Sequence, residues 1–165
     1  MSLGAEGSVD DIAVGELAAH AGVSRSTFYQ HFASKDDFLV RSFVNMLVAM
    51  NATMRQRHPD RGDILPAQPL FHHVAMAGEF ARSVARSEIW PLQMAAGELK
   101  LRELAEAVLP QRMPHWNAEE RREAAVFLAA GLIGLLRWWV DNGMKQTPER
   151  MQAAFERLSN SVLSG

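Results

Sequence analysis

The chain has 165 residues, of which 48% are hydrophobic, so it can fold as one domain or as a small head on a larger body. Its formal net charge of −2 excludes a protein that coats nucleic acid over its whole surface, so any DNA contact must be local. The absence of cysteine excludes disulfides, zinc–thiolate sites and a cysteine nucleophile, and it suits a reducing, cytoplasmic location. The most apolar stretch, 124–140, contains Arg137 and is shorter than the roughly 20 residues that span a bilayer, so no membrane partner is expected.

The first expected elements are two short helices joined at a glycine. Leu17 and Ala18 share the apolar face of a helix that should end at Gly22, where glycine supplies the left-handed backbone of the turn. Ser24 is placed to cap the second helix, and Val23 is expected to fill the gap between the two. This spacing is typical of a helix-turn-helix.

The rest of the chain also has helical apolar spacing, which predicts an all-α protein. Ser34 and Asp37 form a capping signal before a long helix that should run to about Arg57. The proline-rich stretch 58–69 is expected to be a loop. Further helices are expected over residues 70–85, 88–96, 98–109 and 118–142, with a last helix opening at 147–148. We expect a DNA-binding head over residues 1–50 and a ligand-binding and dimerisation body over 51–165.

The second short helix carries the most informative pattern. Phe28 and Phe32, four residues apart, are expected to anchor it on the first helix and on the long helix behind. The remaining face then shows hydrogen-bonding side chains without an acid, which major-groove reading requires: Arg25, Ser26, Thr27, Tyr29, Gln30 and His31. The alternative is a solvated polar face on an ordinary helical hairpin. The turn glycine, the acid-free face and Lys35 at the next helix start together favour DNA binding.

Residues 21–35, AGVSRSTFYQHFASK, resemble the signature of TetR-family transcriptional regulators, AGVS-x-x-T-x-Y-x-H-F-x-x-K. The resemblance implies a homodimeric, ligand-responsive regulator, most often a repressor, that binds a palindromic double-stranded DNA operator. Carried over by position, it implies phosphate contacts for Thr27, Tyr29, His31 and Lys35, and base contacts for Arg25, Ser26 and Gln30, with Ser24 at the start of the same DNA-binding element.

The N-terminus departs from this family pattern. Members begin with a basic arm and a helix that packs beneath the reading hairpin, whereas residues 1–13 contain Gly4, Gly7, Glu6, Asp10 and Asp11. The first helix is therefore expected to be missing. A helical ligand-binding dimer that does not bind DNA stays open as the alternative function.

The C-terminal third is expected to form the dimer seam. Residues 124–140 are apolar nearly all round, which indicates burial on more than one side of the helix. The alternative is a purely monomeric core. The residues expected in the seam are Gly131, Gly134, Leu135, Met151, Phe155, Leu158 and Val162.

Methionine and aromatic side chains in the body suggest a pocket for a small apolar or aromatic ligand, although a plain packed core remains open. The candidate lining residues are Phe71, Met76, Phe80, Trp90, Met94, Phe127 and Trp138. His72 and His73 with Glu79 could suggest a metal, but adjacent helical residues point about 100° apart, so no metal site is expected. No nucleophile elbow, catalytic triad or phosphate-binding glycine loop is present, so no enzyme activity and no cofactor are expected.

Overall fold

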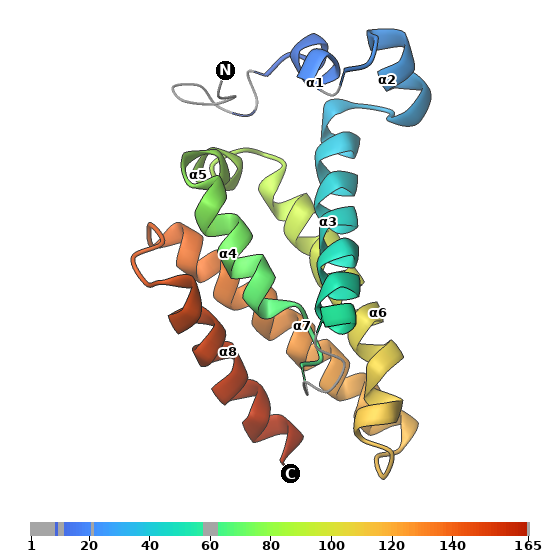
Figure 1. Cartoon of the computed structure of the whole chain (residues 1–165), viewed down its shortest axis with the longest axis vertical. Coiled ribbons are helices and arrows are strands. Elements are labelled where there is room, and N and C mark those ends of the chain that lie inside the picture. Colours follow the sequence, from blue (N-terminus) through green and yellow to red (C-terminus); the bar gives the residue numbers. More distant parts are fainter. Residues whose placement is uncertain (1–8, 10–11, 21, 58–62, 165) are drawn as a thin grey trace.

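The computed structural model describes Val9 and residues 12–20, 22–57 and 63–164, and all regular structure in these ranges is helical. The expected all-α class is confirmed. The helices are α1 (Val14–His20), α2 (Arg25–His31), α3 (Lys35–Arg57), α4 (Ala67–Ala77), α5 (Glu79–Ala85), α6 (Trp90–Arg112), α7 (Ala118–Asp141) and α8 (Pro148–Leu163). Figure 1 shows α1 and α2 at one end of the molecule, above α3, which runs down beside the other helices.

Side-chain caps start the helices where the sequence predicts them. The Ser24 hydroxyl accepts a hydrogen bond from the backbone N–H of Thr27 at 3.1 Å, and the Ser34 hydroxyl accepts one from Asp37 at 3.0 Å. Asn117 forms a reciprocal capping box at the start of α7. Each cap satisfies N–H groups that have no partner within the helix.

The body is built around one hydrophobic core. Its largest buried side chain is Trp139 of α7, whose ring meets that of Phe71 from α4 edge to face at 5.6 Å between centroids. The indole N–H donates to the carbonyl of Gln146 at 3.0 Å, so its polar atom is satisfied. α7 is long and apolar enough to cross a membrane. Half of its most apolar stretch is buried inside the body, however, as in the core helix of a globular protein.

The helix boundaries differ from the expectation at two glycines. The helix expected over 70–85 is broken at Gly78, which has a φ of 51° and separates α4 from α5. The two helices expected over 88–96 and 98–109 are one helix, α6, which continues through Pro110 to Arg112. Gly97 does not end a helix; it lets α3 approach, because a Cβ there would lie 2.5 Å from Cε1 of Phe43.

Val9 packs at the junction between the DNA-binding head and the body. Its side chain is buried with Leu39, Val84 and Ile89, and its N–H donates to the hydroxyl of Ser83 at 3.0 Å. The expected absence of a first helix concerns residues 1–13, most of which lie outside the described part of the chain. The expected role of Val23 is wrong, because this side chain is 39% exposed and does not fill the gap between α1 and α2.

Candidate functional site

The buried face of α2 is aromatic. Phe28 is 2% exposed, and its ring lies 5.2 Å from that of Phe32 and 5.4 Å from that of Phe38, between centroids. Leu17 and Ala18 of α1 complete this cluster. The predicted anchoring of α2 by Phe28 and Phe32 is confirmed, and it directs the opposite face of the helix to solvent.

The solvent face of α2 gathers the side chains that the sequence predicts for DNA contact. Arg25, Ser26, Tyr29, Gln30 and His31 are exposed, and Thr27 is half-buried. The hydroxyls of Ser24 and Thr27 lie 2.9 Å apart and hydrogen-bond each other at the helix start. The result is a surface rich in donors and acceptors, with no carboxylate on α2 itself.

Gly15, to which the sequence analysis assigned no role, leaves room for the side chain of Arg25. A Cβ at residue 15 would lie 2.8 Å from both Nε and Nη2 of Arg25, so the guanidinium lies against the backbone of α1. Glycine inside a helix costs about 1 kcal/mol relative to alanine. That cost is the sequence signal that could have indicated a close contact at this position.

Two basic side chains of α3 complete the head. Lys35 is half-buried, and its Nζ donates to the carbonyl of Val9 at 3.2 Å. Arg41 donates to the carbonyl of His31 at 2.7 Å and lies 5.0 Å above the ring of Phe32. Sequence analysis missed Arg41, because its position ten residues after His31 in the chain does not reveal the contact.

The seven residues predicted for a dimer seam divide into two groups. Gly134 and Leu158 are exposed, Gly131, Leu135 and Val162 are half-buried, and no atom lies within 4 Å of a Cβ added at either glycine. Met151 and Phe155, in contrast, are buried in the core of the same chain. The seam prediction is corrected for these two, because their side of α8 faces α4 and α7.

The seven residues predicted for a ligand pocket are not brought together. Phe71 and Met94 fill the hydrophobic core, and Trp90 is packed against it. Four others lie at the surface: Met76, Phe80, Phe127 and Trp138. None of the seven is among the residues that line the three cavities of about 200, 400 and 580 Å³, so the ligand pocket stays a prediction. Methionine and aromatic residues of a helix satisfy the same spacing whether they face a core, a seam or a cavity.

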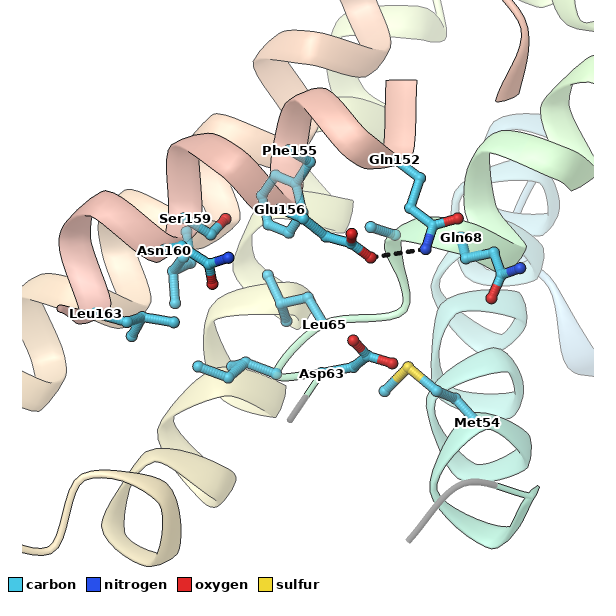
Figure 2. Close-up of a pocket in the computed structure, with 13 residues that line it drawn as sticks. Met54, Asp63, Leu65, Gln68, Gln152, Phe155, Glu156, Ser159, Asn160 and Leu163 are labelled. Carbon is cyan, nitrogen blue, oxygen red and sulfur yellow. Dashed lines mark hydrogen bonds between the residues drawn. The ribbon is translucent and has the colours of Figure 1, made fainter. Parts of the chain in front are cut away.

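Two of the cavities in the described part of the chain exceed about 300 Å³. One of about 400 Å³ opens between the end of α3, residues 63–68, α7 and α8 (Figure 2). The other, of about 580 Å³, lies between α3 and α4 and is lined by Met46, Met50 and Met54, with Arg57 and His72 among its polar residues. His72 also pairs with Glu149 at 3.2 Å, and no group of metal-ligating side chains occurs among the described residues.

Comparison with known proteins agrees with this architecture. Residues 2–41 match the model of bacterial regulatory proteins of the tetR family, and residues 67–161 match that of a transcriptional regulator C-terminal region. No curated protein matches the chain. Because the two matches cover the helix-turn-helix and most of the body, the chain belongs to the TetR family of transcriptional regulators, which are DNA-binding transcription factors and not enzymes.

Proposed function

We propose that this protein is a cytoplasmic repressor that binds a palindromic operator as a homodimer and releases it when a small molecule occupies the body. The observation that carries the proposal is the acid-free, solvent-facing side of α2, backed by the buried ring of Phe28. A helix held in this way can enter the major groove with its N-terminal residues against base edges.

The proposed contacts divide by chemistry. Arg25 and Gln30 suit guanine and adenine edges, respectively, and Ser26 suits either. Thr27, Tyr29, His31 and Lys35 contact phosphates, together with Ser24 at the helix start. Lys35 opens α3, where the positive end of the helix dipole already favours an anion.

The proposed dimer closes through α7 and α8. Phe127 is 54% exposed and Trp138 48% exposed on the same side of α7, with Gly134 between them, and Leu158 of α8 is 47% exposed. Large apolar side chains on one continuous face indicate a protein interface. An isologous contact at these helices would set the two heads in the two-fold arrangement that a palindrome requires.

The decisive experiment is selection of operator DNA from a random library, followed by titration at several salt concentrations. Gln30→Ala should relax the preference at one base position by roughly 1–3 kcal/mol. Lys35→Ala should weaken binding to all sequences alike and reduce the salt slope by about one. Lys145→Ala, on the exposed turn between α7 and α8, is the matched control and should change neither.

If Lys35→Ala changed the sequence preference and left the salt slope unaltered, the division into phosphate and base contacts would be refuted. If no sequence were selected although the chain formed dimers, a ligand-binding dimer without DNA binding would replace the repressor.

Control by a ligand requires two conformations of the dimer that differ in the distance between the DNA-binding heads. The small molecule must bind one of these conformations better than the other. A 100-fold loss of operator affinity needs about 2.7 kcal/mol of such preference.

A further inference from the structure

The last carbonyl of α2 belongs to His31 and needs a donor from outside its helix. α2 has seven residues, and the backbone becomes extended at Phe32, with a φ of −131° and a ψ of 132°. The last carbonyls of a helix have no partner within the helix. Here the donor is Arg41 of α3, whose Nη1 lies 2.7 Å from the His31 carbonyl oxygen. The end of α2 is therefore held by the helix that leads into the body.

Two further contacts fix the Arg41 guanidinium. Its Cζ atom lies 5.0 Å from the centroid of the Phe32 ring, and its Nη1 lies 3.5 Å from Oδ2 of Asp37. The same carboxylate oxygen accepts a hydrogen bond from the backbone N–H of Ala33 at 3.0 Å. The end of α2, the residues that follow it and the first turns of α3 are thus joined through Arg41 and Asp37.

The aromatic cluster beneath α2 does not determine the direction of the helix by itself. The rings of Phe28, Phe32 and Phe38 lie 4.9 to 5.4 Å apart between centroids. Burial of apolar rings is non-directional, whereas a hydrogen bond weakens steeply as its angle departs from linear. A helix of two turns also has little stability of its own. The hydrogen bond from Arg41 therefore selects one orientation of α2 on the cluster.

The two ends of α2 are held by different groups. Gln30 precedes His31 directly, so the direction of its side chain depends on the end that Arg41 holds. Arg25 lies at the other end, where Ser24 caps the helix and Gly15 leaves room for the guanidinium. A bidentate contact with a base edge requires two aligned hydrogen bonds. A change at Arg41 should therefore disturb base reading by Gln30 more than base reading by Arg25.

An arginine at this place could also bind DNA directly, because the Arg41 side chain is 54% exposed. The contacts favour the indirect role, since Nη1 donates to the His31 carbonyl and Asp37 balances part of the charge. The two roles differ in a measurable way. A phosphate contact contributes to the salt dependence of binding, whereas a contact within the protein does not.

We propose that Arg41 is a positioning residue for base recognition. It fixes the C-terminal end of α2 on α3 and so determines how precisely Gln30 reads its base, without itself touching DNA. The effect on DNA rests on the proposed repressor function. The effect on the orientation of α2 does not, because it is a property of the chain without DNA.

The test compares two substitutions at the same position. Arg41→Met keeps most of the apolar stem over Phe32 but has no N–H donor, whereas Arg41→Lys keeps one charged donor. Arg122→Met is the matched control, since Arg122 is exposed at the start of α7, at the end of the molecule opposite to the head (Figure 1). Circular dichroism confirms that each variant is folded.

The first measurement uses the full chain without DNA. In Arg41→Met, the ¹³C resonance of the His31 carbonyl should shift, and the residual dipolar couplings of the α2 amides should change relative to those of α3. Both should stay close to the unmodified values in Arg41→Lys and in Arg122→Met, because the donor to the carbonyl is kept.

The second measurement uses the selected operator. Arg41→Met should weaken binding by about tenfold, the scale of one hydrogen bond to a charged group, with an unchanged salt slope. It should relax the preference at the base read by Gln30 more than at the base read by Arg25, and Arg41→Lys should restore most of both effects. In a Gln30→Ala background, Arg41→Met should change that preference no further.

The proposal is overturned if α2 keeps its orientation in Arg41→Met, or if the preference at the two bases changes equally or not at all. A salt slope that falls by about one would also overturn it, because Arg41 would then contact a phosphate. If the unmodified chain selected no operator and α2 still turned in Arg41→Met, the repressor function would be refuted and the hold of Arg41 on α2 supported.

Discussion

Gly97→Ala tests the close approach of α3 and α6, on which the placement of the DNA-binding head depends. A Cβ at residue 97 would lie 2.5 Å from Cε1 of Phe43, far inside ordinary contact, and 3.4 Å from Cδ1 of Ile133. Phe43 belongs to α3, the helix that leads from the head into the body. The added methyl must therefore displace the Phe43 ring or move α3 away from α6.

Two effects of opposite sign decide the outcome. Alanine is favoured over glycine inside a helix by about 1 kcal/mol. Overpacking of a well-filled contact costs roughly 1–3 kcal/mol. Because Phe43 is an aromatic ring packed against the core, we expect the clash to win and the free energy of unfolding to fall by about 1 kcal/mol. For a chain of this size the melting temperature should then fall by roughly 2–4 °C.

Urea denaturation of the unmodified chain, Gly97→Ala, Phe43→Leu and the double variant measures the coupling between the two positions. The smaller leucine should make room for the methyl group, so the double variant should be more stable than the sum of the single changes predicts. A stabilising Gly97→Ala, or changes that simply add, would refute the close contact. Operator affinity of Gly97→Ala should also fall, since α3 carries the head.

Three other substitutions test separate parts of the molecule. Gly134→Arg should give monomers or insoluble protein by placing a charge in the proposed seam, and sedimentation of the unmodified chain as a well-folded monomer would contradict that seam. Ser83→Ala should lower the free energy of unfolding by roughly 1–3 kcal/mol by leaving the Val9 N–H without its partner, and should speed hydrogen exchange of that amide; unchanged exchange would contradict this role. Hydrogen bonds from its own backbone N–H and from the Thr147 hydroxyl, with a smaller contribution from His72, lower the pKa of Glu149 below its ordinary 4.5. Because the folded-state pKa is lowered, this stabilisation is present above about pH 4.5 and is lost at lower pH, so Glu149→Gln should reduce the loss of stability in urea titrations between neutral and acidic pH.

Much of the head could be predicted from the sequence because its determinants are local. Gly22 has a φ of 69°, Ser24 caps α2, and Phe28 and Phe32 meet at the spacing of one helical turn. Each of these features depends on residues within four positions along the chain. The motif that indicates the family lies in the same short stretch, and the family matches confirm it.

The body could be predicted as helices but not as an arrangement of surfaces. A methionine or an aromatic residue obeys the same helical spacing in a core, at a seam or beside a cavity, so Met151 was expected at the seam and is in the core. Separate helices were expected before and after Gly97, but they form one helix. The role of Gly97 could not be predicted, because it depends on Phe43, more than fifty residues earlier.

The lining of the cavity of about 400 Å³ could not be predicted from the sequence either. Asp63 and Glu156 come from distant parts of the chain, and they line the same cavity only because α8 packs along α4. Local rules determine which segments are helical and which face is apolar. Packing between distant segments determines which apolar face is covered by the chain itself and which side chains share a cavity, because burial depends on the neighbours that the tertiary structure supplies.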